Sequence, residues 1–271
     1  MAGNISLYTY LAASASFAML VLLLSLRWRV KELGTSLVLA CTASTLWAAI
    51  IGLGTLAEYP PMILIQLSEL LRNIAWLYFL LQLLGLQTEG TTLSVFGRDW
   101  RPLFLLGAAI ALALVLAPMA GVPISQQIVL GMWLLMAIAA MLLMEQLYRN
   151  ATTDERWSHK FLCLGLGAVA AWDFFMYSEA LLFNSLDPEL WQSRGLVNAI
   201  VAPLLGVAFA RYSGPRAQLQ VSRQVVFHTV TLMGAGIYLL GMALIGYFLK
   251  FMGGTWGSVL QLGFLVAAGA L

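Results

Sequence analysis

The chain has few charged residues and only two cysteines. Charged residues make up 10% of its 271 residues and hydrophobic residues 61%, against about 25% and 45–50% in an average soluble domain. This composition excludes an ordinary soluble fold and indicates a multi-pass membrane protein. Cys41 and Cys163 lie in apolar segments without a CxxC pair or a neighbouring histidine, so neither a disulfide nor a zinc site is predicted.

The motifs of common soluble enzymes are also missing from the sequence. It contains no GxxxxGK phosphate loop, no GxSxG nucleophile elbow and no HExxH zinc motif. His159 and His228 have no second histidine at metal-ligand spacing. We therefore predict no catalytic residue, no metal site and no cofactor in this chain, and we expect no nucleic-acid partner.

Long apolar runs dominate the sequence instead. Eight of them are long enough to cross a hydrocarbon layer of ~30 Å, and they are continuous rather than alternating, which favours helices over a barrel. A ninth run starts at Trp256 and reaches Leu271, which is short of the ~20 residues of a full span. The expected fold is an all-α integral membrane bundle of eight transmembrane helices plus a truncated ninth, at 7–26, 33–56, 62–86, 102–119, 127–148, 160–183, 195–211, 225–251 and from 256 onward.

The basic residues predict the orientation of these spans. Most of the 14 basic residues lie in alternate connections, namely Arg27, Arg29 and Lys31; Arg98 and Arg101; Arg149, Arg156 and Lys160; and Arg211, Arg216 and Arg223. The opposite connections contain only Arg194 and Lys250. Cytoplasmic loops collect Lys and Arg, so we expect the N-terminus outside and the ninth span directed towards the cytoplasm. No basic residue precedes the first run, so we expect that run to be retained rather than cleaved as a signal peptide.

Four ionisable residues lie within the predicted spans. They are Glu69 and Arg72 in the third span and Asp173 and Glu179 in the sixth, and each costs about 2.5–3.5 kcal/mol at the centre of a bilayer. Arg72 and Asp173 are both about 15 Å from the outer end of their span, by the helical rise, so they can pair if the two helices are neighbours. Glu69 shares a helix face with Arg72, which predicts a buried cluster with a net charge near −1. Glu179 is about 120° away from Asp173 around the helix axis.

Polar and aromatic residues surround this predicted cluster and allow two interpretations. A buried ion pair can serve only to set the helix register. Aromatic side chains with a few polar groups also suit a small-ligand pocket open to the outer side. The candidate ligand or signal site consists of Glu69, Arg72, Asp173, Glu179, Asn198, Trp76 and Tyr177, with Asn73, Tyr78 and Trp172 nearby.

Several segments of the chain resemble the PrsK-type sensor histidine kinases of the PEP-CTERM/exosortase system of Gram-negative bacteria. They are EQLYRN at 145–150, RW at 156–157, KFLCLGLG at 160–167, DF at 173–174, RGLVNA at 194–199, VSRQVVFH at 221–228 and GGTWG at 253–257, together with SELLRN at 68–73. The similarity is greatest between residues 145 and 256.

The resemblance implies that residues 1–271 form a multi-pass membrane sensor and anchor domain of the bacterial inner membrane. In the parent protein, a cytoplasmic GAF-like domain and a histidine-kinase core would follow, with ATP and Mg²⁺ as the kinase cofactors. The kinase would form a homodimer and phosphorylate a response regulator that controls exopolysaccharide and PEP-CTERM protein genes. Two other functions stay open from the residues alone. One is a small-solute or proton-coupled transporter that uses the same charges, and the other is a passive membrane scaffold.

Overall fold

The computed structural model describes residues 2–27, 33–56, 62–88, 100–151 and 153–211, and every secondary-structure element in this part of the chain is a helix. Its elements are α1 (Ala2–Arg27), α2 (Leu33–Gly54), α3 (Met62–Thr88), α4 (Trp100–Leu116), the short 3₁₀ helix η1 (Ala117–Ala120), α5 (Gln126–Asn150), α6 (Thr153–Phe183) and α7 (Pro188–Arg211). The predicted eighth and ninth spans, the histidine His228 and the segments VSRQVVFH and GGTWG lie outside the described residues.

Each of the seven α-helices is long and apolar enough to cross a bilayer. The described part of the chain therefore has the character of a multi-pass membrane protein, as its composition predicts. The first six helices contain the first six predicted spans apart from a few residues at their ends. Helix ends differ because polar residues continue a helix beyond its apolar run, as the 153–159 extension of α6 illustrates.

The seventh helix begins earlier than predicted. The apolar run suggested a start at residue 195, but α7 starts at Pro188. Asp187 precedes it, and its Oδ1 accepts hydrogen bonds from the backbone N–H groups of Glu189 at 2.6 Å and Leu190 at 3.3 Å. Aspartate at the N-cap followed by proline at the first helical position is a common helix start. The prediction that Arg194 lies in a connection was therefore wrong, because it lies inside α7.

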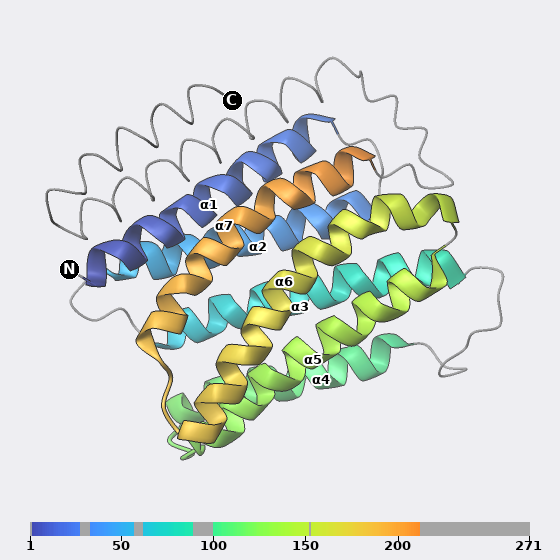
Figure 1. Cartoon of the computed structure of the whole chain (residues 1–271). Helices are drawn as coiled ribbons and strands as arrows, with labels where there is room; N and C mark the ends of the chain where they lie inside the picture. The colour runs from blue at the N-terminus through green and yellow to red at the C-terminus, as the bar shows by residue number, and fades with distance from the viewer. Residues whose placement is uncertain (1, 28–32, 57–61, 89–99, 152, 212–271) are drawn as a thin grey trace, which may run out of the picture. The chain divides into compact units, whose positions relative to one another are not determined.

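Six of the helices pack in a closed order, and α4 lies beside them (Figure 1). Helix α1 packs between α2 and α7, α2 packs on α3, and α6 packs between α5 and α7. The α3–α5 contact completes the order, while α4 touches mainly α3 and α5. The third and sixth helices thereby come close enough to α7 for their side chains to meet it.

Helix α4 buries little of its surface within the described residues. Only Ala111 and Val115 are buried along it, whereas Leu105 and Leu106 are more than half exposed. Leucines in contact with hydrocarbon carry no penalty in a bilayer. This face of α4 is therefore suited to contact lipid.

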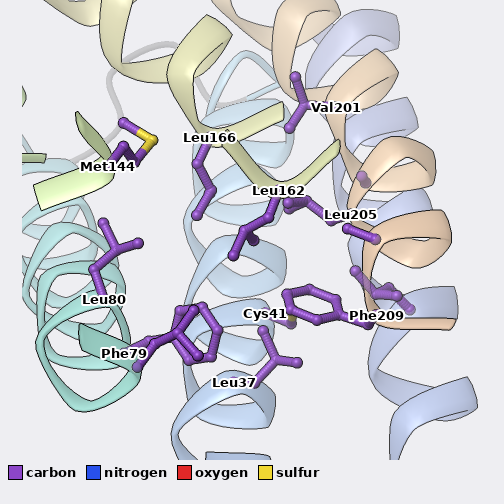
Figure 2. Close-up of a cluster of buried hydrophobic side chains, with 14 of the residues drawn as sticks. Leu37, Cys41, Phe79, Leu80, Met144, Leu162, Leu166, Val201, Leu205 and Phe209 are labelled. Carbon is purple, nitrogen blue, oxygen red and sulfur yellow. The ribbon is translucent and has the colours of Figure 1, made fainter. Parts of the chain in front are cut away.

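Apolar side chains fill one half of the bundle, towards the ends at which α1, α3 and α7 finish. We call this group the apolar cluster; Figure 2 shows several of its members on α2, α3, α5, α6 and α7. It includes Phe17 and Leu20; Leu37 and Cys41; Phe79, Leu80 and Leu83; Met144 and Leu147; Leu162 and Leu166; and Val201, Leu205 and Phe209. The other half of the bundle contains the buried charges together with two smaller apolar clusters, one around Trp133 and Tyr177 and one around Tyr10 and Trp47.

Candidate functional site

Four charged side chains are buried together between α3, α6 and α7. Glu69 and Arg72 come from α3, Asp173 from α6 and Arg194 from α7, and their exposed fractions are 2%, 2%, 5% and 0%. We call these four residues the ionic cluster. Three of them belong to the predicted site, and Arg194 is new.

Asp173 accepts hydrogen bonds from both arginines of the ionic cluster. Arg72 Nη2 lies 2.8 Å from Asp173 Oδ2, so the predicted Arg72–Asp173 pair is confirmed. Arg194 binds the same carboxylate with two atoms, its Nε at 2.7 Å from Oδ1 and its Nη2 at 2.9 Å from Oδ2. Such two-point contacts fix orientation as well as distance, and here they link α6 firmly to α7.

Glu69 is held from α6 and α7. Arg194 Nη2 lies 2.5 Å from Glu69 Oε1, and the Tyr177 hydroxyl donates to the same oxygen. Arg194 therefore bridges both carboxylates. The ionic cluster contains two cations and two anions, so its formal charge is zero. The expected net charge near −1 was wrong because the count left out Arg194.

Aromatic rings enclose the two guanidinium groups. Arg72 Cζ lies 4.0 Å from the centre of the Trp47 ring, and Arg194 Cζ lies 5.0 Å from it. Trp191 and Tyr177 also lie within 5.5 Å of Arg194 Cζ. A cation over an aromatic face gains about 2 kcal/mol or more when both are desolvated. Trp47 thus stabilises both arginines and adds α2 to the site.

Helix α1 is tied to the same region through Tyr10. The Tyr10 hydroxyl donates to the backbone carbonyl of Trp191 at 2.7 Å, and its ring meets Trp47 edge-on at 5.5 Å between centres. Gly195, next to Arg194, lies so close to α1 that an added Cβ would come 2.8 Å from Thr9 Oγ1 and 2.9 Å from Tyr10 N. The glycine is therefore what lets α7 approach α1 at the level of Arg194.

The sequence analysis missed Arg194, Trp47 and Tyr10 as residues of the site, and the sequence contains a signal only for Arg194. The Asp187–Pro188–Glu189 segment marks a helix start, and Arg194 is six residues beyond Pro188, so this signal would have placed Arg194 within the helix. Trp47 and Tyr10 had no comparable signal, because a tryptophan or tyrosine in an apolar run is expected to be an ordinary core residue.

Of the remaining predicted residues, Asn198, Trp76 and Asn73 form side-chain hydrogen bonds, whereas Glu179 stands apart from the ionic cluster. Asn198 is buried and donates to the Arg194 carbonyl at 2.9 Å, and Trp76 Nε1 donates to Ser44 Oγ at 2.9 Å. Asn73 Oδ1 accepts from Arg72 Nη2 at 3.2 Å. Among the described residues, Glu179 forms no hydrogen bond or ion pair with the ionic cluster, and its buried Oε2 has no hydrogen-bond partner.

Two of the nearby aromatic residues lie away from the ionic cluster. Tyr78 packs against Trp100 and Phe104 of α4. Trp172 Nε1 donates to the Leu190 carbonyl at 3.4 Å, which joins α6 to the start of α7. Both residues therefore support helix packing rather than the ionic cluster itself.

A cavity of about 50 Å³ lies beside the ionic cluster, chiefly between α3, α5 and α6. Arg72, Asn73, Asp173 and Asn198 are its polar lining residues. Its other lining residues are apolar or aromatic: Phe17, Trp76, Leu77, Leu80, Trp133, Met136, Ala137, Ala140, Met144, Leu166, Val169, Ala170 and Val201. The structure thus has a small pocket with one polar region, next to residues of the predicted site.

No family model, curated protein or solved structure matches this chain. In the described residues, no group of three or more His, Cys, Asp and Glu side chains is placed to hold a metal ion. The site offers a neutral, hydrogen-bonded set of charges that joins three helices, and a cavity beside it. Such an arrangement can couple the occupation of the cavity to the relative positions of α3, α6 and α7.

Proposed function

We propose that this chain is the membrane sensor and anchor region of a bacterial two-component histidine kinase. The observation that carries the proposal is the ionic cluster, which links α3, α6 and α7 beside a cavity. A ligand or a change in the bilayer can act on such a bundle only through different affinities for two of its conformations. Ion pairs shared among three helices are suited to define such conformations, because their geometry is strict.

The proposal includes the topology expected from the basic residues. The N-terminus lies outside, two further spans follow α7 at 225–251 and from Trp256, and the ninth span points to the cytoplasm. Arg194 no longer counts as a basic residue of an outer connection because it is buried in α7, which strengthens the charge asymmetry. In this orientation the ionic cluster lies in the outer half of the bilayer and the apolar cluster in the cytoplasmic half.

The kinase part of the proposal is supported by the resemblance to PrsK-type kinases. SELLRN in α3, DF in α6 and RGLVNA in α7 contain Glu69, Arg72, Asp173, Arg194 and Asn198, so three of the resembling segments supply residues of the site. The parent kinase would sit in the inner membrane, form a homodimer and use ATP and Mg²⁺. It would phosphorylate a response regulator that controls exopolysaccharide and PEP-CTERM protein genes.

A small-solute transporter is the second candidate function, favoured by the cavity that adjoins buried charges. The apolar cluster argues against it. Phe79, Leu205 and Phe209 fill the helix interfaces beyond the cavity, where a transported polar solute would have to pass. The absence of a visible internal repeat also counts mildly against the inverted-repeat transporter folds.

The reading frame of the gene beyond codon 271 tests the kinase proposal directly. We expect it to continue through a phospho-accepting histidine and an ATP-binding domain. A frame that stops just after the ninth span would contradict the proposal. Uptake of a labelled solute by proteoliposomes that contain the chain would support the transporter instead.

Phosphorylation in native membranes tests the role of the ionic cluster. Arg72→Ala and Asp173→Ala in the full-length protein should each change basal autophosphorylation, and the double variant should recover part of the loss, because paired residues couple by about 0.5–3 kcal/mol. Arg149→Ala is the matched control, since Arg149 forms an exposed 3.3 Å pair with Glu145. Additive effects of the two cluster variants, or an equal effect of the control, would contradict the role.

A further inference from the structure

Two asparagines that line the cavity each use only one half of their amide group. Asn73 Oδ1 accepts from Arg72 Nη2 at 3.2 Å, and Asn198 Nδ2 donates to the Arg194 carbonyl at 2.9 Å. An arginine can only donate and a carbonyl can only accept, so these partners fix the direction of each amide. Asn73 Nδ2 and Asn198 Oδ1 form no hydrogen bond within the described part of the chain. The cavity therefore has a spare donor on α3 and a spare acceptor on α7.

The two spare atoms can be reached from the cavity. Arg72 Nη1 is sealed inside the protein without a partner, whereas neither Asn73 Nδ2 nor Asn198 Oδ1 is fully enclosed. Asn198 is only 2% exposed, so the open surface of its oxygen belongs to the cavity that it lines. Both amide groups are thus available to a molecule inside the protein.

The helices that supply these atoms lie opposite each other in the closed order. On one side α1 and α2 separate α3 from α7, and on the other side α5 and α6 separate them. Asn73 is eleven residues from the start of α3 and Asn198 ten residues from the start of α7, which places both at a depth of about 15 Å. A donor and an acceptor at one level, on helices that do not pack together, are suited to a bridging molecule.

The charge and size of the site limit what this molecule can be. The ionic cluster beside it is already neutral, and an added ion would be buried without a counter-ion, which is costly. The molecule must also accept from Asn73 and donate to Asn198, as a hydroxyl group does. The volume of about 50 Å³ has room for about four water molecules at most.

Water meets these conditions and has a third partner close by. Asp173 lines the cavity, and its Oδ1 accepts a single hydrogen bond, from Arg194 Nε. A carboxylate oxygen can accept a second bond. Buried waters have two to four polar partners, whereas purely apolar cavities stay dry. The polar end of the cavity offers three partners, so it fits water, while its apolar end does not.

We propose that the polar end of the cavity binds a short chain of water molecules that joins Asn73 on α3 to Asn198 on α7 beside Asp173. These waters give the two opposite helices an uncharged, hydrogen-bonded connection next to the ionic cluster. The proposal concerns the chain itself and does not depend on the sensing function.

Hydroxyl-radical footprinting of the whole chain in lipid nanodiscs tests for this water. An X-ray pulse converts water into hydroxyl radicals, and a radical formed from a bound water oxidises the side chains around it, which mass spectrometry detects. Trp133 lines the cavity and Trp47 does not, although both are buried, at 4% and 0% exposed. We expect Trp133 to be oxidised and Trp47 to stay unmodified. Equal oxidation of the two rings, or none at Trp133, would overturn the proposal.

A pair of variants on α5 shows whether the oxidation depends on the cavity. Ala137 lines the cavity and Ala139 does not. The added carbons of Ala137→Leu occupy the cavity and displace the water, so the oxidation of Trp133 should be lost. Ala139→Leu should retain it. Oxidation that Ala137→Leu leaves unchanged, or that both variants remove, would overturn the proposal.

The two asparagines provide a second measurement that does not require the cavity to be filled. Asn73→Ala and Asn198→Ala each remove one end of the water chain. The double variant should therefore lower the midpoint of thermal unfolding by less than the sum of the two single shifts. Fully additive shifts would overturn the water bridge. The sensing function would still stand in that case, because the Arg72 and Asp173 variants test it separately.

Discussion

Both halves of the described bundle contain packed apolar side chains, but only one of them also contains buried charges. In one half, four buried charges share hydrogen bonds of 2.5–2.9 Å across α3, α6 and α7. In the other half, aliphatic and aromatic side chains from α1, α2, α3, α5, α6 and α7 fill the interior (Figure 2). The same helices pass through both halves, so the difference lies in the side chains and not in the backbone.

The comparison shows what the ionic cluster adds to apolar packing. Lipid tails are as apolar as leucine, so apolar contacts between helices gain little from leaving the lipid and depend on close packing. Many packings satisfy an apolar interface about equally well. The carboxylate of Asp173 accepts the guanidinium fork of Arg194 in few geometries, so the ionic cluster selects which helices are neighbours and at what level.

Removal of Arg194 should produce the largest loss of stability, because it breaks the ion pairs that distinguish one half of the bundle from the other. Arg194→Ala leaves Glu69 without its cation and Asp173 with only Arg72, and a broken buried pair costs about 3–5 kcal/mol. We expect this loss in the free energy of unfolding, measured by steric trapping in bicelles. The control is Arg149→Ala at the exposed pair with Glu145, which should cost no more than about 0.5 kcal/mol. Similar losses for the two variants would show that the ionic cluster contributes no special stability.

A truncation in the apolar cluster should also lower the free energy of unfolding, but by less than the removal of Arg194. Leu205 is fully buried on α7, and Leu205→Ala should lower the free energy of unfolding by about 2–4 kcal/mol, because the removed methyl groups leave a cavity. Leu135→Ala, at a leucine that is 67% exposed, should be close to neutral in the same assay. A loss at Leu205 larger than at Arg194 would reverse the order of the two halves.

A substitution at Gly195, where α7 contacts α1, should have an effect of intermediate size on stability. Gly195→Ala places a Cβ within 2.8 Å of Thr9 Oγ1, and overpacking of this kind costs about 1–3 kcal/mol. Gly167 on α6 has open space around its Cα, so Gly167→Ala should be neutral or gain up to about 1 kcal/mol from helix propensity. Gly195→Ala should therefore lower the midpoint of thermal unfolding in detergent while Gly167→Ala does not, and equal shifts would argue against a close α1–α7 approach at this level.

The smallest effect is expected between the two halves, at Trp76. Trp76→Phe removes the 2.9 Å hydrogen bond to Ser44 Oγ and should cost about 0.5–1.5 kcal/mol. Ser44→Ala should cost a similar amount, and the double variant little more than either single variant, since both remove the same bond. A double variant with fully additive loss in thermal unfolding would show that the bond is not shared as described.

Much of the fold followed from the apolar runs. Six of the seven described helices lie where continuous apolar segments predicted them, because a helix that crosses a bilayer must be apolar along its length. The helix α7 was predicted seven residues too short. Its first turns contain Glu189, Gln192 and Arg194, and a criterion based on hydropathy rejects polar residues even where they are buried and paired.

The Arg72–Asp173 pair could be predicted because depth along a span follows from residue counting alone. Both residues are ten positions from the same-side end of their helices, and the rise per residue is constant. The contribution of Trp47 could not be predicted in this way. Its ring lies against Arg72 only because α2 packs on α3, and helix neighbours are not encoded in any local pattern.

The sequence by itself determined that the chain contains membrane-length helices and that Glu69, Arg72 and Asp173 lie well inside two of them. Hydropathy and helical rise are local properties, so they can be read residue by residue. Only the tertiary structure decided that Arg194 neutralises the two carboxylates, that Trp47 covers both guanidinium groups, and that a cavity adjoins Arg72. These features depend on which helices are neighbours, and that choice is made by contacts between residues more than 100 positions apart.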